Sequence, residues 1–209
     1  MLDPDCVIEV RGLSKSFAGF MAVKAVDLKV KRGHIHAMIG PNGAGKTTCF
    51  NLLTKTIEPS AGTIWYNGQD ITRMAPAQVA QMGMVRSFQI SAIFATLTVR
   101  DNVRVALQRK QGTSFKFWRS DKMLASLNER ANSLLEDVGL SAEADMIAGD
   151  LSYGRKRALE IATTLALDPE LLLLDEPTSG MGLEDVALTS ALIRRVARNR
   201  TVLMVEHNL

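Results

Sequence analysis

The segment GPNGAGKTT at residues 40–48 restricts the fold of this chain more than any other feature. It matches the pattern Gly-x-x-x-x-Gly-Lys-Ser/Thr, in which a glycine-rich turn connects a buried strand to a helix. The apolar run HIHAMIG (34–40) precedes it, and CFNLLTKT continues it as a helix would. Glycines let backbone amides converge on phosphate oxygens, and the helix N-terminus favours negative charge. The sequence therefore predicts a phosphate-binding loop, rather than a glycine-rich turn with a chance lysine.

Each polar residue at the end of this loop has an expected task. Lys46 is expected to reach the β- and γ-phosphates, Thr47 to bind Mg²⁺ through its hydroxyl, and Thr48 to contact the α-phosphate. The loop residues expected to surround the phosphates are Gly40, Pro41, Asn42, Gly43, Ala44 and Gly45. The loop therefore predicts a nucleoside triphosphate and Mg²⁺ as its ligands.

Two acidic residues close the apolar run LLLLDEP at 171–177. In an open parallel sheet, the carboxyl ends of the strands form the edge that binds ligands. Asp175 is expected to hold Mg²⁺ through water, and Glu176 to polarise an attacking water. The alternative is an acidic region before the helix expected at 184–199, and the phosphate loop argues against it because phosphoryl transfer needs both groups.

His207 ends a second apolar run, TVLMVEH, at 201–207. A parallel strand beside 171–175 would bring this histidine to the same edge, where it would hydrogen-bond the γ-phosphate and orient the water. A histidine at a strand end, taken alone, is more often structural. Its expected role therefore depends on the neighbouring strand.

Three kinds of pattern predict the fold class. Alternating residues at 6–10 and 26–30, and Asn67-Gly68 between strand-like residues, predict antiparallel strands with a hairpin. Helical patterns at 98–110 and 121–138 predict an inserted helical subdomain. Helices and buried strands then alternate, at 153–167, 171–177, 184–199 and 201–207.

Such alternation is typical of a parallel sheet with covering helices. We therefore expect one α/β domain over 1–209 with a P-loop NTPase core, a mainly parallel sheet and an N-terminal antiparallel β subdomain. The core is expected over 1–90 and 150–209, and the α-helical subdomain over about 91–150.

Composition excludes several classes of protein. The chain has 209 residues, of which 46% are hydrophobic and 22% charged, and a net charge of +3 does not point to nucleic acid. Two cysteines, Cys6 and Cys49, imply no disulfide framework and fit a reducing cytosol. The first residues lack a basic region typical of a signal peptide, and no apolar stretch is long enough to cross a bilayer.

The order of these motifs resembles the nucleotide-binding subunit of ATP-binding cassette (ABC) transporters over essentially the whole chain. By this resemblance, Phe17 stacks on adenine, and Gln89 contacts Mg²⁺ and water and relays to the membrane subunit. Ser152 and Gly154 in LSYGR match the signature motif, which is usually LSGGQ. The same resemblance makes Glu176 the catalytic base and His207 the switch histidine, and it places SGMG (179–182) in the loop that crosses to a partner subunit.

The resemblance extends to one group of importers. RSFQISAIFATLTVRDNVRVAL and YGRKRALEIA are similar to patterns of branched-chain amino acid importers, which urea and short-chain amide importers share. It implies an ATPase that uses ATP and Mg²⁺, and that closes as a dimer with a second ABC subunit. It also implies integral membrane permeases, an indirect periplasmic binding protein, and a cytoplasmic position on the inner face of the membrane.

Several positions depart from the family pattern. Tyr153 interrupts the usual Gly-Gly pair, and Arg155, which replaces the usual Gln, is expected to favour or crowd a γ-phosphate. Gly182 stands where many cassettes carry Asp. The chain ends two residues after His207, which predicts an exposed sheet edge and reduced activity in this form.

Two other functions fit parts of the sequence. The basic and aromatic stretch RKQGTSFKFWRSDK (109–122) would suit a cassette protein acting on nucleic acid, although a solvated loop or a permease-docking surface fits it better. A non-catalytic nucleotide-binding module is the other alternative, and the intact Lys46, Asp175, Glu176 and His207 argue against it. Cys49 predicts either simple packing or a thiol whose alkylation blocks ATP binding.

Overall fold

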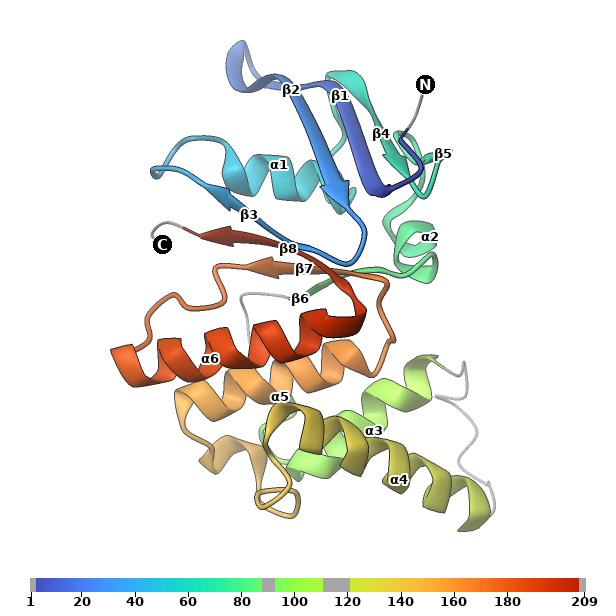
Figure 1. Ribbon diagram of the computed structural model, residues 1–209, viewed down its shortest axis with the longest axis vertical. Helices are drawn as coiled ribbons and strands as arrows, with labels where there is room; N and C mark the ends of the chain where they lie inside the picture. Colours follow the sequence, from blue (N-terminus) through green and yellow to red (C-terminus); the bar gives the residue numbers. More distant parts are fainter. Residues whose placement is uncertain (1–2, 88–92, 111–120, 207–209) are drawn as a thin grey trace. The chain divides into compact units, whose positions relative to one another are not determined.

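The computed structural model describes residues 3–87, 93–110 and 121–206, with the side chains of 110 and 121–126 left aside (Figure 1). Its backbone contacts divide the chain into two compact units. The first unit comprises 1–86, 170–177 and 197–209, and the second comprises 87–169 and 178–196. No helix among the described residues is long and apolar enough to cross a membrane.

An antiparallel sheet fills the N-terminal part of the first unit. It is formed by β1 (Cys6–Phe17), β2 (Phe20–Lys31), β4 (Ala61–Tyr66) and β5 (Gln69–Asp70), in the order β2-β1-β4-β5. Tyr66 pairs with Gln69, so Asn67-Gly68 forms the two-residue turn that the sequence predicts. The strands expected at 6–10 and 26–30 are confirmed, and each is longer than its apolar alternation suggested.

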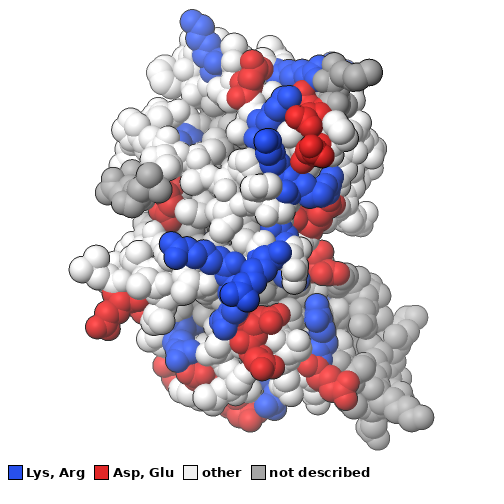
Figure 2. All heavy atoms as spheres, viewed as in Figure 1, with Lys and Arg blue, Asp and Glu red and all other residues white. Residues whose placement is uncertain are grey.

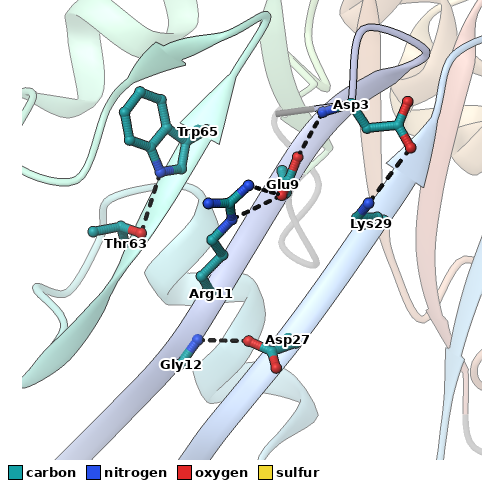
Figure 3. A network of polar contacts seen from close by, with 8 residues as sticks. All are labelled: Asp3, Glu9, Arg11, Gly12, Asp27, Lys29, Thr63 and Trp65. Carbon is teal, nitrogen blue, oxygen red and sulfur yellow. Dashed lines mark hydrogen bonds and ion pairs between the residues drawn. The ribbon is translucent and has the colours of Figure 1, made fainter. Parts of the chain in front are cut away.

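Polar side chains cover part of this antiparallel sheet (Figure 3). Glu9 on β1 accepts hydrogen bonds from the Arg11 side chain and, at 3.0 Å, from the backbone N–H of Asp3. The Asp3 amide and the Arg11 side chain hold the pKa of Glu9 below its usual value. Asp27 on β2 accepts from the Gly12 amide at 2.7 Å. These bonds tie β1 to β2 and to the N-terminal segment.

The second sheet contains β3 (Ile35–Ile39), β6 (Met84–Ser87), β7 (Leu171–Asp175) and β8 (Thr201–Glu206), in the order β3-β8-β7-β6. β8 pairs in parallel with both β3 and β7. Every residue of β7 is buried, as its continuous apolar run predicted. The prediction of a buried strand at 34–40 is wrong for β3. Among the described strands it lies at the sheet edge with a single neighbour, so Ile35 and Ile39 keep 41% and 48% of their surface exposed.

One apolar cluster unites both sheets of the first unit with α1 (Lys46–Leu53). Phe50 and Leu53 of α1 are fully buried in it, together with Ile64 of β4 and Leu203 of β8. Burying side chains of this size stabilises the fold by roughly 1.5–3 kcal/mol each. The helix that begins at the phosphate-binding loop is therefore held firmly by both sheets. A short helix, α2 (Pro76–Gln81), precedes β6.

The second unit is helical. It contains α3 (Val99–Lys110), α4 (Asp121–Val138), α5 (Tyr153–Leu165) and α6 (Leu183–Val196), with a short 3-10 helix, Ala148–Asp150, before α5. All four helices lie close to the ranges that the sequence predicts. A second 3-10 helix, Ala197–Asn199, continues from α6 toward β8. The predicted helical subdomain at 91–150 supplies α3 and α4, and the contacts group α5 and α6 with them.

Candidate functional site

The loop between β3 and α1 has the backbone shape that a phosphate-binding loop needs. Gly43 and Gly45 adopt left-handed conformations, with φ of 80° and 83°, and Gly45 is the N-cap of α1. A Cβ atom on Gly45 would lie 2.5 Å from the carbonyl oxygen of Ala22 on β2. Residues 41–44 are exposed, so the turn is open to a ligand. Only glycine fits at position 45, for conformational and steric reasons together.

Three consecutive side chains begin α1. Lys46 is 8% exposed, and its Nζ donates to the carbonyl oxygen of Pro41 at 3.0 Å and to that of Gly40. Thr47 is exposed and Thr48 is half-buried. The first turn of α1 contains no acidic residue, so its dipole and its lysine both favour an anion. This end of the helix suits the phosphates of a nucleotide.

The parallel register brings the carboxyl ends of three strands to one edge. Ile39 pairs with Glu206, and Val205 pairs with Asp175. The phosphate-binding loop starts directly after Ile39, and Glu176 directly follows Asp175. The prediction that the loop and the acidic pair share an edge is therefore supported by the strand register.

The two acidic residues differ in environment. Asp175 is fully buried and forms an ion pair with Arg86. Glu176 is half-buried and has a left-handed φ of 45°, while its backbone N–H donates to Val205 at 3.0 Å. A non-glycine residue with a left-handed backbone conformation costs about 1–3 kcal/mol of stability, and such strained residues cluster at active sites. The strained turn directs the chain away from β7 at the residue expected to activate water.

Arg86 on β6 is a residue of this edge that sequence reasoning missed. Besides its ion pair with Asp175, its Nη1 donates to Oδ1 of Asn51 on α1 at 2.6 Å. Its guanidinium carbon lies 5.6 Å from the centre of the Phe50 ring. The signal was present in the segment VRSFQ, but spacing alone does not reveal which acidic group an arginine will meet.

The expected adenine-stacking residue, Phe17, lies at the tip of the β1–β2 hairpin. It pairs with Phe20, and the two rings are 45% and 71% exposed. The Nζ of Lys15 lies 5.1 Å from the Phe17 ring centre. The strand that starts at Phe20 reaches Ala22, whose carbonyl abuts Gly45. The hairpin therefore presents exposed aromatic rings close to the loop, as base stacking requires.

The signature segment starts α5 in the helical unit. Ser152 is the N-cap, and its hydroxyl accepts from the Arg155 amide at 3.5 Å. A Cβ on Gly154 would lie 2.6 Å from Oδ1 of Asp185 on α6. The Tyr153 hydroxyl donates to the carbonyl of Ser179 at 3.3 Å. The start of α5 is thus packed against the segment that leads into α6.

Arg155, whose role the sequence left open, has a use within its own unit. Its Nη1 donates to the carbonyl oxygen of Gly139 at 2.6 Å, and its Nη2 lies 3.2 Å from Oε1 of Glu143. A cation at the last carbonyls of α4 is favourable because the helix dipole is negative there. These contacts support a capping role rather than a phosphate contact.

Three expectations fall on residues that are not described. Gln89 and His207 lie outside the described residues, as do residues 111–120 of the basic and aromatic stretch.

Cys49 is described, and only 3% of its surface is exposed. Burial raises the pKa of the Cys49 thiol to about 11. The structure favours the packing interpretation, because a buried thiol with so high a pKa reacts slowly.

The oxygen groups at this edge fit a magnesium ion. Mg²⁺ is usually held by few protein oxygens together with substrate phosphates and water, so it needs no cage of side chains. The described residues contain no cluster of three or more His, Cys, Asp or Glu side chains that could hold a metal ion. The exposed hydroxyl of Thr47 and the carboxylate of Asp175 are the groups that would hold the ion.

The match with a protein-family model agrees with this fold and site. The family model described as "ABC transporter" matches residues 23–179. The chain belongs to the ABC transporter family, whose ATP-binding cassettes hydrolyse ATP.

Among its relatives, the branched-chain amino acid transport ATP-binding protein BraF of Pseudomonas aeruginosa is 38% identical. That match covers 97% of this chain and 82% of the relative. LivG of Escherichia coli, which has the same description, is 36% identical with the same coverage of both chains. The solved structure of the ATP-binding cassette MJ1267 in its ADP conformation is similar with a TM-score of 0.84 and 27% identity. It covers 98% of this chain, and 82% of that cassette is matched.

Proposed function

We propose that this chain is the ATP-hydrolysing subunit of an importer for branched-chain amino acids. The observation that carries the proposal is the common sheet edge of the phosphate-binding loop and the Asp175–Glu176 pair, set by the pairing of β3, β8 and β7. The relatives named above, which are described as branched-chain amino acid transport proteins, support the substrate class. Basic and acidic side chains are interspersed on the face shown in Figure 2.

Each residue of the edge has a part in the proposed hydrolysis. Gly45 and the loop amides bind the phosphates, and Lys46 turns from the loop carbonyls to the β- and γ-phosphates. Thr47 and Asp175 would hold Mg²⁺, which would supply positive charge to neutralise the phosphates. Glu176 accepts the proton of the attacking water. Phe17 orients the base, while Gln89 and His207 complete the site as the resemblance implies.

A second cassette subunit is part of the proposal. Ser152 and the amide of Gly154 cap the γ-phosphate that is bound to the loop of the other subunit, so that ATP closes a dimer and hydrolysis reopens it. Integral membrane permeases convert this motion into transport, and a periplasmic binding protein supplies the substrate to them. The subunit works at the inner face of the cell membrane.

Replacement of the proposed base tests the mechanism. Glu176→Gln should lower ATP hydrolysis by about 100-fold or more, because the amide cannot accept a proton. ATP binding should persist, and a closed dimer should accumulate in size-exclusion chromatography. Glu129→Gln on the exposed surface of α4 removes the same charge and should behave as the unchanged protein. Normal hydrolysis by Glu176→Gln would contradict the assignment.

Uptake by the assembled transporter tests the substrate. Cells that carry the complete transporter should accumulate labelled leucine, isoleucine and valine, and Lys46→Ala should abolish this uptake. Preferential uptake of urea or short-chain amides would assign the transporter to the alternative class.

A further inference from the structure

Arg86 connects three elements that meet at the proposed catalytic edge. It extends from β6, forms an ion pair with Asp175 on β7, and donates to Asn51 on α1 at 2.6 Å. Its side chain is 14% exposed and that of Asp175 is 1% exposed, so both charges lie largely away from water. A buried carboxylate without a partner is costly, and the guanidinium compensates it through a directed hydrogen bond.

The hydrogen bond from Arg86 to Asn51 connects Arg86 to the helix that begins at the phosphate-binding loop. Asn51 follows Thr47 by four residues in α1, so the two side chains lie on one face of the helix, a turn apart. Thr47 and Asp175 are two of the residues proposed to hold Mg²⁺. The planar guanidinium of Arg86 thus connects Asn51, one helical turn after Thr47, to Asp175. Lysine, a single point charge, does not match this fork geometry.

The guanidinium is itself held in place. Its carbon lies over the Phe50 ring at 5.6 Å, and Phe50 is fully buried in the core. In the part of the chain that the structure describes, the buried Nε of Arg86 has no hydrogen-bond partner. Its two terminal nitrogens donate to Asn51 on α1 and to Asp175 on β7, so the guanidinium connects two different elements.

We propose that Arg86 is a positioning residue that orients the Asp175 carboxylate relative to the phosphate-binding helix, and so sets the metal affinity of the nucleotide site. This inference rests on the proposed function, because it assumes that Asp175 holds the metal of the bound nucleotide. Arg86 acts through Asp175 and Asn51 and does not itself touch nucleotide or metal. An ion pair that only stabilised the fold would affect nucleotide and metal binding alike.

The test separates metal affinity from nucleotide affinity. Mn²⁺ replaces Mg²⁺ as the probe, and its binding to the ADP-loaded full chain is measured by electron paramagnetic resonance. Nucleotide binding is measured separately in the presence of EDTA. Arg86→Met should weaken Mn²⁺ binding by roughly 10- to 100-fold, the usual effect of losing a residue that orients a metal ligand. Nucleotide affinity in EDTA should stay within about two-fold, since the loop amides and Lys46 are untouched.

Further variants keep the test decisive if Arg86→Met folds poorly. Arg86→Lys and Asn51→Ala should each weaken Mn²⁺ binding, and Arg86→Met should add nothing to Asp175→Asn, because it acts through that carboxylate. Arg100→Met breaks another arginine–aspartate ion pair, to Asp145 in the helical unit, and should leave Mn²⁺ affinity unchanged. Thermal unfolding of every variant is recorded in parallel.

Two outcomes would overturn the inference, and they differ in their meaning. If Asp175→Asn weakens Mn²⁺ binding while the Arg86 and Asn51 variants do not, or if the effects of Arg86→Met and Asp175→Asn simply add, only the role of Arg86 is wrong. If Asp175→Asn itself leaves Mn²⁺ affinity unchanged, the proposed metal site is wrong and the role of Arg86 fails with it.

Discussion

At the scale of single residues, Gly43 and Gly45 show two different reasons why a phosphate-binding loop needs glycine, namely a left-handed backbone and close packing. Both have left-handed φ, but only Gly45 is in close contact with a neighbouring chain segment. A Cβ on Gly43 would meet nothing within 4 Å, whereas one on Gly45 would strike the Ala22 carbonyl. Gly45 therefore joins the loop to β2, the strand that starts at the exposed aromatic hairpin.

This difference predicts unequal effects of one methyl group. Gly43→Ala should cost about 1 kcal/mol of stability, from backbone conformation alone. Gly45→Ala should cost at least about 2 kcal/mol, because overpacking is added to the same strain. It should also weaken nucleotide binding much more, since the loop must move from β2. Chemical denaturation and fluorescent-nucleotide titration measure the two effects, and equal losses in both variants would contradict the steric argument.

At the scale of elements, a histidine of β3 is hydrogen-bonded to the last residue of β2. The Nε2 of His36 on β3 accepts a hydrogen bond from the Lys31 backbone N–H at 2.9 Å, so this ring nitrogen carries no proton. Burial lowers the pKa of His36 below its ordinary value of 6.5. Protonation would remove the acceptor and place a charge in a half-buried position. The attachment of β3 to β2 therefore depends on pH.

We expect stability to decline as the pH falls below about 6.5. The unfolded chain takes up a proton near its ordinary pKa, and the folded chain resists protonation to a lower pH, so the His36 contribution is complete above 6.5 and is lost below it. His36→Gln keeps an acceptor without titrating and should flatten the decline in denaturation curves between about pH 7.5 and 5. Identical slopes for His36→Gln and the unchanged protein would rule out this histidine.

At the scale of the whole molecule, the residues proposed to act on ATP belong to different compact units of the chain. The loop and the acidic pair belong to the first unit, whereas Ser152 and Gly154 start α5 in the second. Ser152 caps its own helix, and Gly154 leaves space for Asp185. Ser152 is exposed, and the proposal that this helix start serves a second subunit is the reason why hydrolysis is expected to need a dimer.

Ser152→Arg tests whether the signature segment serves the ATP site of a second subunit. The long cation should prevent the signature segment from capping a γ-phosphate, so ATP hydrolysis should be lost. Each subunit should still bind ATP with unchanged affinity, because its own loop is intact. Arg155→Ala removes a nearby capping contact and should mainly lower stability. Loss of ATP binding by monomeric Ser152→Arg would show that the segment serves its own subunit's site.

Local patterns were sufficient for much of the molecule. The phosphate-binding loop, the Asn67-Gly68 hairpin and the buried β7 follow from turn chemistry, helix starts and apolar runs, which depend on residues close together in the chain.

Other features came from the tertiary structure alone. The edge position of β3 depends on which strands pair, and the contacts of Arg86 and Arg155 join residues that lie far apart in sequence or on different elements. A long polar side chain finds its partner only when packing brings a charge within reach. The sequence by itself thus determined which chemical groups are available for the proposed site, and the fold decided which residues contact those groups.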